Sequence, residues 1–163
     1  MKHTISILLE NESGALSRVA GLFSARGYNI ESLIVAPTND PSLSRMTLVT
    51  SGSEEIIDQV IKQLNKLIDV VKLMDLTDYS HISREMLLVK ISVTREEQVR
   101  IKHLADIFKA RILDVTSTAY TLELTGNSEK LNAFLAALSD TDIVEVVRSG
   151  AMGLARGDRS LTL

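Results

Sequence analysis

The sequence predicts an α+β protein made of two similar βαββαβ units, each an antiparallel sheet with helices on one face. Segments in which apolar and polar residues alternate, typical of strands, are interspersed with segments whose apolar residues recur at i, i+3, i+4 and i+7, typical of helices. The same order of segments occurs twice within 163 residues. Each expected helix has one apolar face, which suits it to cover one side of a sheet. Such units are ferredoxin-like.

The first unit begins with an alternating strand, and the helix after it is expected to stop at Gly27. Ser53 is placed to cap the second helix, with Glu54 and Glu55 in its first turn. The apolar stripes of the two helices are Leu16, Val19, Ala20 and Phe23, and Ile57, Val60, Ile61 and Leu64. The expected strands are residues 3–10, 30–36, 45–51 and 70–74.

The second unit repeats this order. Thr94 and Glu97 have the spacing of a capping box that opens its first helix. The stripes of its helices are Ile101, Leu104, Ala105 and Phe108, and Leu131, Phe134, Leu135 and Leu138. The expected strands are residues 86–93, 112–115, 120–124 and 143–147.

The repeat divides the chain into four parts. We expect a first domain at residues 1–76, a short polar linker at 77–83 and a second domain at 84–150. Residues 151–163 contain glycines and arginines, and we interpret them as a tail that is mobile or bound to a partner. Arg156-Gly157-Asp158 matches an adhesion tripeptide, which we attribute to chance.

Composition excludes several classes of function. The formal charge of −3 is spread along the chain and aromatic residues are 4%, which argues against binding nucleic acid. Cysteine is absent, so neither a disulfide framework nor a thiolate metal site is expected. No apolar stretch approaches the ~20 residues that a membrane span needs, and the first residues lack the apolar block of a signal peptide. We expect a protein of the cytoplasm.

Catalytic signatures are also missing from the sequence. The three histidines, His3, His81 and His103, are far apart, and no carboxylates cluster with them to form a metal site. Neither a phosphate-binding P-loop nor a dinucleotide-binding glycine motif is present. We therefore expect no catalytic residue, no metal ligand and no cofactor on this chain.

The segment from Glu10 to Gly14 is the most informative part of the sequence. It joins the first strand to the first helix, whose leading N–H groups suit a carboxylate or phosphate. Asn11 can both donate and accept, and Gly14 has no Cβ, so a ligand could approach the backbone closely. A simpler interpretation is that Ser13 is an ordinary N-cap and Gly14 an ordinary turn residue.

The corresponding turn of the second unit is different. There, Glu96 and Glu97 place negative charge at the start of the helix, where it would repel a carboxylate. A carboxylate-binding turn is thus expected only in the first unit. Gly21, in the middle of a helix, is open to two interpretations: contact with the backbone of a partner, or close packing on its own sheet.

Three segments of the chain are distinctive: LLENESGALSRVAGLFSARGYNIESLIVAP, DPSLSRMTLVT and RSGAMGLARGD. In these segments, and over nearly its whole length, the chain resembles a known family, the regulatory small subunits of acetohydroxyacid synthase (acetolactate synthase), whose N-terminal half is an ACT domain.

The resemblance implies a non-catalytic subunit that activates a large catalytic subunit and confers feedback inhibition by valine in branched-chain amino-acid biosynthesis. Thiamine diphosphate, magnesium and FAD are then expected on the large subunit. The family implies a homodimer through the ACT domain, with valine bound between the two protomers. The implied contacts are Asn11, Gly14, Ala15 and Leu16 from one protomer and Asn29 and Ile30 from the other.

Two other classes of function remain as alternatives. An effector-binding transcription regulator would need a helix-turn-helix and a basic face, and no segment supplies either. A small stand-alone enzyme would need a clustered acid–base pair or a cofactor loop.

Overall fold

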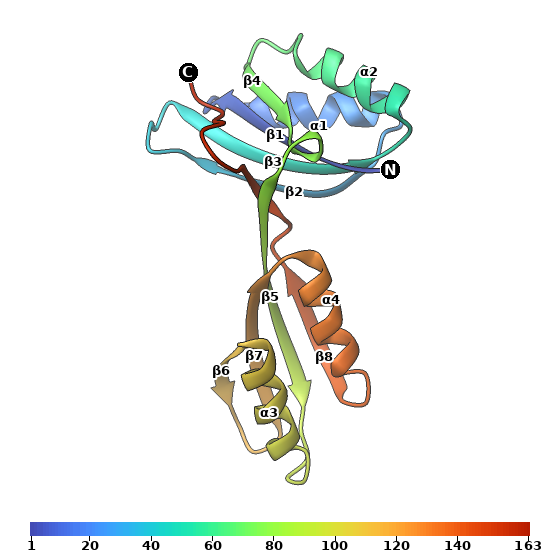
Figure 1. The fold of residues 1–163 in the computed structure, drawn as a ribbon, viewed down its shortest axis with the longest axis vertical. Coiled ribbons are helices and arrows are strands. Elements are labelled where there is room, and N and C mark those ends of the chain that lie inside the picture. Colours follow the sequence, from blue (N-terminus) through green and yellow to red (C-terminus); the bar gives the residue numbers. More distant parts are fainter. The chain divides into compact units, whose positions relative to one another are not determined.

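The computed structural model describes residues 1–163, which divide into two compact units. Unit 1 comprises Met1–Ser83 together with Ala151–Leu163, and unit 2 comprises Arg84–Gly150. The chain therefore passes from one unit to the other twice, once on the way out and once on the return (Figure 1).

Unit 1 is a four-stranded antiparallel sheet with two helices on one face (Figure 1). The strand order is β2-β3-β1-β4, so β2 and β4 form the edges. The expected order of elements is confirmed. The elements are β1 (Lys2–Glu10), α1 (Ala15–Ala25), β2 (Ile30–Pro37), β3 (Leu43–Ser51), α2 (Glu54–Leu64) and β4 (Val70–Asp75), followed by a 3₁₀ turn, η1 (Leu76–Asp78).

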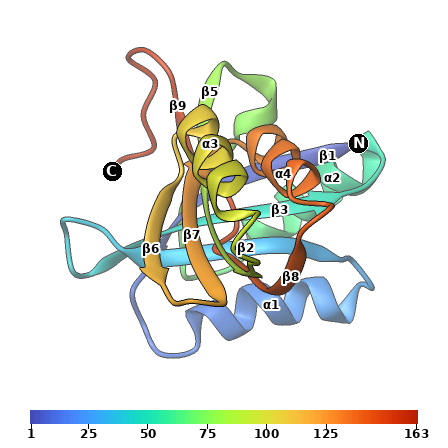
Figure 2. The same cartoon turned by 90° about the horizontal axis from the view of Figure 1, so that it is seen from below.

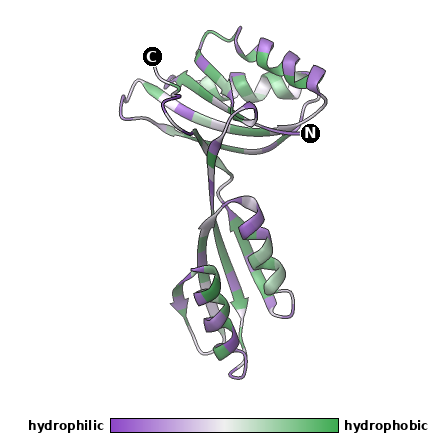
Figure 3. Cartoon of the chain, in the orientation of Figure 1, coloured by the Kyte–Doolittle hydropathy of each residue, from purple (hydrophilic) through white to green (hydrophobic).

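The core of unit 1 lies between the sheet and its two helices. The helical stripe residues Val19, Phe23, Val60 and Leu64 pack against Ile5, Ile7, Leu9, Met46 and Leu48 of the central strands. Each helix shows both hydrophilic and hydrophobic residues along its length (Figure 3). This agrees with the amphipathic pattern in the sequence.

Local signals set the ends of these helices. Ser53 caps α2 by accepting a hydrogen bond from the N–H of Ile56, as expected. Gly27 ends α1 with φ +68°, and the N–H of Tyr28 donates to the carbonyl of Phe23 at 3.0 Å. The rings of Phe23 and Tyr28 also meet edge to face, with centroids 6.2 Å apart. This combination is a Schellman C-cap with its usual apolar contact.

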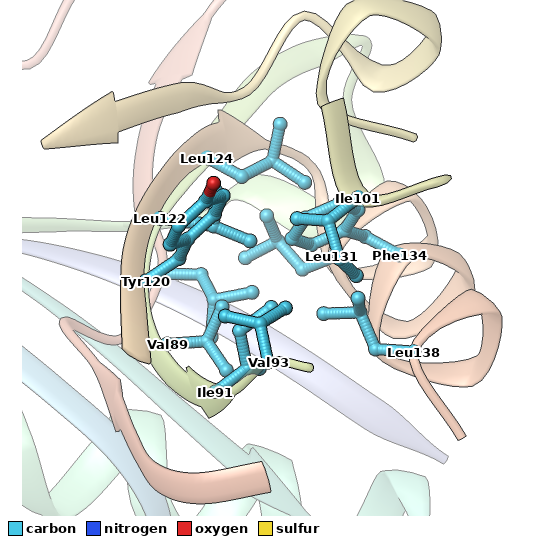
Figure 4. Close-up of a cluster of buried hydrophobic side chains, with 11 residues drawn as sticks. Val89, Ile91, Val93, Ile101, Tyr120, Leu122, Leu124, Leu131, Phe134 and Leu138 are labelled. Carbon is cyan, nitrogen blue, oxygen red and sulfur yellow. The ribbon is translucent and has the colours of Figure 1, made fainter. Parts of the chain in front are cut away.

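Unit 2 has the same design, with strand order β6-β7-β5-β8. Its helices α3 and α4 lie side by side on one face (Figure 2). Figure 4 shows its core, in which Tyr120, Leu122 and Leu124 of β7 face Leu131 and Phe134 of α4. The elements are β5 (His81–Ser92), α3 (Gln98–Phe108), β6 (Arg111–Val115), β7 (Ala119–Gly126), α4 (Ser128–Ala137) and β8 (Asp142–Arg148).

Residues 77–83 are more regular than the linker expected there. They contain most of η1 and the first three residues of β5, which begins at His81. The structure divides its two units inside this strand, between Ser83 and Arg84.

Residues 151–163, expected to form a mobile or partner-bound tail, belong to unit 1 and contain regular structure. Met152–Ala155 form a ninth strand, β9, which pairs with β5, and the rest of the tail lies against unit 1. Leu161 is buried, and its carbonyl accepts a hydrogen bond from Arg45 at 3.4 Å. A Cβ at Gly153 would lie 2.4 Å from Leu76 Cδ1, so a side chain at this position would require the buried Leu76 to shift.

Candidate functional site

The turn between β1 and α1 is held at its base by two backbone hydrogen bonds. The N–H of Glu10 donates to the carbonyl of Asp69 at 2.8 Å, and the N–H of Asn11 donates to that of Ser42 at 2.8 Å. The turn is therefore attached on both sides, to the start of β4 and to the start of β3.

The first helix starts without a side-chain cap. Its N-cap is Gly14, with φ +87°, a left-handed conformation that favours glycine, and no side chain bonds the leading N–H groups. The simpler interpretation, in which Ser13 is the N-cap, is wrong. The N–H groups of Gly14, Leu16 and Ser17 have no partner within the chain. These three donors point along the positive end of the helix dipole, where an anion is stabilised.

Asn11 is oriented by a hydrogen bond of its side chain. Its Nδ2 donates to the carbonyl of Pro41 at 2.9 Å, while its Oδ1 has no partner. The amide therefore presents a free acceptor in the same strand-to-helix connection that carries three free donors. A zwitterion, with one carboxylate and one ammonium, matches this combination of groups.

Ala15 and Leu16 occupy different environments within the predicted set. Ala15 is buried and its N–H donates to the carbonyl of Glu12 at 3.2 Å, so its backbone helps to close the turn. Leu16 is 44% exposed, although it belongs to the apolar stripe expected for this helix. An exposed leucine beside free backbone donors could cover the apolar part of a ligand.

Arg18 was not predicted from the sequence. Its Nε and Nη2 donate to the two carboxylate oxygens of Asp69 at 2.5 and 3.0 Å, and Nη2 also reaches the carbonyl of Ser13 at 3.3 Å. This pairing lowers the pKa of Asp69 and raises that of Arg18. A Cβ at Gly14 would lie 2.9 Å from Arg18 Nη1, so the guanidinium stands directly beside the turn.

Asn29 and Ile30 lie at the other end of α1, where β2 begins. The carbonyl of Asn29 accepts a hydrogen bond from Thr50 Oγ1 at 2.6 Å, while its side chain is exposed and without a partner. Ile30 is half-buried and packs on the core, and the register of β2 against β3 shifts just after it. At roughly 1.5 Å per residue, the 11 residues of α1 separate this pair from the Asn11–Leu16 turn by about 16 Å.

The corresponding turn of unit 2 is closed by its own side chains. Glu97 Oε2 accepts hydrogen bonds from the N–H and the hydroxyl of Thr94, both at 2.9 Å. These bonds lower the pKa of Glu97. The expected capping box forms only in part, because α3 begins at Gln98 and its N-cap is Glu97 instead of Thr94.

The histidines do not come together in the structure. His3 Nδ1 lies 2.7 Å from Asp75 Oδ2 in the interior, and His81 Nδ1 contacts the carbonyl of Tyr79. No three residues among His, Cys, Asp and Glu are grouped in a way that could hold a metal ion. None of the helices is long and apolar enough to cross a membrane. Successive α-helices are always separated by strands.

Comparison with known protein families gives two matches, one to each unit. Residues 5–72 match the AHAS small subunit-like ACT domain, and residues 84–157 match the small subunit of acetolactate synthase. The first range includes all the predicted site residues.

Individual relatives agree with these family matches. The chain is 56% identical to the acetolactate synthase isozyme 3 small subunit of Salmonella typhimurium, over 98% of both chains. It is 44% identical to the probable acetolactate synthase small subunit of Archaeoglobus fulgidus, over 98% of this chain and 99% of that protein. The crystal structure of the acetolactate synthase small subunit from Thermotoga maritima superimposes with a TM-score of 0.88 at 33% identity, covering 98% of this chain and 99% of that one. By sequence and by fold, the chain belongs to the family of acetolactate synthase small subunits.

Proposed function

We propose that this chain is a non-catalytic regulatory subunit that activates the large catalytic subunit of acetolactate synthase and confers feedback inhibition by valine. The observation that carries the proposal is the uncapped start of α1, where the N–H groups of Gly14, Leu16 and Ser17 are free beside the free Oδ1 of Asn11. An α-amino acid presents the complementary carboxylate and ammonium groups.

The proposed site divides the recognition of valine among three kinds of group. The free N–H groups at the start of α1 bind its carboxylate, with the helix dipole behind them. The side-chain oxygens of Asn11 and Asn29 accept from its ammonium. Leu16 and Ile30 enclose its isopropyl group, and Ala15 keeps the turn in shape from its buried position.

A homodimer follows from the separation of the two sets of residues. The Asn11–Leu16 turn and the Asn29–Ile30 pair lie at opposite ends of one helix, so a single valine cannot touch both in the same chain. β2 is an edge strand with unpaired backbone groups, and Leu33, Ile34 and Val35 along it are only half-buried. Such an edge can pair with a second copy, and pairing side by side would bring one protomer's turn to the other's Asn29.

The chemistry of acetolactate formation belongs, in this proposal, to the large subunit. Thiamine diphosphate, magnesium and FAD are bound there, and this chain changes only the activity of the complex. We therefore expect no acetolactate from pyruvate when the purified chain is incubated with thiamine diphosphate and magnesium. Turnover by the chain free of large subunit would contradict the regulatory role.

Calorimetric titration of valine into the full-length chain is the direct test. We expect saturable binding, with one valine for each Asn11–Leu16 turn that meets an Asn29–Ile30 pair of the other protomer. We also expect valine to inhibit the large subunit after it is reconstituted with this chain. Titration of alanine, whose methyl group cannot fill the space between Leu16 and Ile30, is the matched control and should bind more weakly. The absence of any valine binding, with the chain folded by circular dichroism, would overturn the proposed function.

A further inference from the structure

We infer that Arg18 is a further effector-binding residue, whose free Nη1 takes part in binding the carboxylate of the amino acid while Asp69 holds the guanidinium in place. This inference rests on the proposed function, because it adds a side-chain cation to the site formed by Asn11 and the start of α1. It also explains why an arginine side chain lies against Gly14.

The guanidinium is fixed through only part of its donor set. Nε and Nη2 are both bonded to Asp69, and Nη2 also to Ser13, whereas Nη1 has no partner in the chain. Asp69 is 4% exposed and is itself placed by its backbone, whose carbonyl accepts from Glu10. A bidentate pair of this kind sets the plane of the guanidinium and leaves the third nitrogen pointing in a defined direction.

The free nitrogen lies beside the free backbone donors. A Cβ at Gly14 would be 2.9 Å from Nη1, which places Nη1 within contact distance of the turn that offers the N–H groups of Gly14, Leu16 and Ser17. The side chain of Arg18 is 46% exposed, so a solute can reach it. The free backbone N–H groups and Nη1 of Arg18 are thus available to the same bound carboxylate.

The second unit provides an internal comparison, because it contains an arginine at the same place in the fold. Arg100 directly precedes buried Ile101 in α3, as Arg18 directly precedes buried Val19 in α1. Its Nη2 bonds Thr141, the residue before β8, at 2.5 Å, whereas Arg18 bonds Asp69, the residue before β4.

In unit 2 a carboxylate of the chain itself occupies the region beside this arginine. Glu97 is at the start of α3, and its Oε1 lies 4.0 Å from Arg100 Nη2. Its Oε2 accepts a hydrogen bond from the N–H of Thr94. The N-cap of α1 is Gly14, which has no side chain, and the first turn of α1 has no acidic residue, so no carboxylate of the chain occupies the start of α1. The carboxylate of a bound amino acid would therefore stand in unit 1 where Glu97 stands in unit 2.

The test distinguishes two roles of Arg18: binding the carboxylate of valine, and only supporting the turn before α1. Asp69→Asn keeps one acceptor that can hold Arg18 in place and removes a negative charge from beside the proposed site. The variant should therefore bind valine at least as tightly as the unsubstituted chain, although its stability is reduced. Arg18→Met in the Asp69→Asn background removes the guanidinium without leaving a buried unpaired carboxylate. We expect valine affinity to fall by about 10- to 100-fold between these two variants, the range for a lost hydrogen bond to a charged group.

Two further variants make the result decisive. Arg18→Lys in the Asp69→Asn background keeps the charge and should recover most of the affinity. Arg100→Met removes the matching arginine of unit 2 and should leave valine binding unchanged. Equal valine affinity of Asp69→Asn with and without Arg18→Met would overturn the inference, as would equal losses in Asp69→Asn and the double variant. If the unsubstituted chain binds no valine at all, the proposed function has failed instead.

Discussion

Gly14 combines three properties that few other residues of the chain share. It is the N-cap of α1, its φ of +87° disfavours any side chain, and an added Cβ would approach the guanidinium of Arg18 to 2.9 Å. A substitution here changes the conformation of the turn, the charge at the helix start and the position of Arg18 together.

Gly14→Asp is therefore expected to abolish the response to valine. Its carboxylate would lie where the carboxylate of valine is proposed to bind, and it would attract the Arg18 guanidinium for itself. A loss of ~4 kcal/mol corresponds to a thousandfold weaker binding. The measurement is valine inhibition of the reconstituted enzyme. We expect stimulation of the large subunit to persist, on the hypothesis that activation uses a different surface.

The matched control for this prediction is Glu97→Ala in the corresponding turn of unit 2. Glu97 closes its own turn through Thr94, so its loss should affect local stability and leave valine inhibition nearly unchanged. Normal valine inhibition in the Gly14→Asp enzyme would show that the site is wrongly assigned.

At the scale of the element, α1 carries a glycine that its own unit does not require. Gly21 is exposed, and a Cβ built there meets no atom within 4 Å. Of the two interpretations drawn from the sequence, close packing on its own sheet is wrong, and contact with a partner backbone stays a prediction.

Gly21→Ala should accordingly stabilise the free chain. Alanine in a helix interior is favoured over glycine by about 1 kcal/mol, which raises the melting temperature of a small unit by roughly 4–8 °C. Thermal unfolding followed by circular dichroism measures this shift. A lower melting temperature would contradict the structure, because it would mean that the added methyl group meets other atoms at this position. Weaker binding of the large subunit by the variant would support the contact with a partner backbone.

In unit 2, strands β5 and β8 are linked by a partly buried ion pair between Arg148 and Glu85. Arg148 Nε and Nη2 each donate to Glu85 at 2.8 Å, and this interaction lowers the pKa of Glu85 below its usual range. The folded state therefore binds the proton of Glu85 less readily than the unfolded state does. Its contribution to stability is fully present above the ordinary glutamate pKa of about 4.3 and is lost as the pH falls through the lower pKa of the folded chain.

The stability of the unsubstituted chain should thus fall more steeply on acidification below about pH 4.3 than that of Glu85→Gln. Urea denaturation at a series of pH values between neutral and acidic would show the difference. Glu85→Gln should be the less stable variant at neutral pH, since it leaves Arg148 without a carboxylate. Parallel pH profiles for the two proteins would contradict this account of the ion pair.

At the scale of the whole molecule, the proposed site requires two copies of the chain. We expect a dimer in solution that valine stabilises, by about 2.7 kcal/mol at a hundredfold excess over its Kd. Sedimentation velocity with and without valine measures the association. A monomer at micromolar concentration with valine saturating would contradict the assignment of Asn29 and Ile30 to a second protomer.

Much of the architecture was predictable from the sequence because its signals are local. Period-2 and period-3.6 patterns identify the four strands and two α-helices of each βαββαβ repeat, since a buried face is repeated along each of these elements. Gly27 and Ser53 mark helix ends through chemistry that acts over a few residues. Asn11 and Gly14 stood out for the same reason, as a polar turn in front of a helix.

Tertiary structure decided what depends on residues far apart in the chain. Arg18 finds Asp69 51 residues away, and no local pattern distinguishes that aspartate from the other acidic residues. The tail has too few residues to bury an apolar face by itself, so its strand forms only where β5 and the surface beneath Gly153 are already in place. Periodicity determines which face of an element is buried, but which charged groups meet at a turn is determined by the closure of the sheet that brings the turns together.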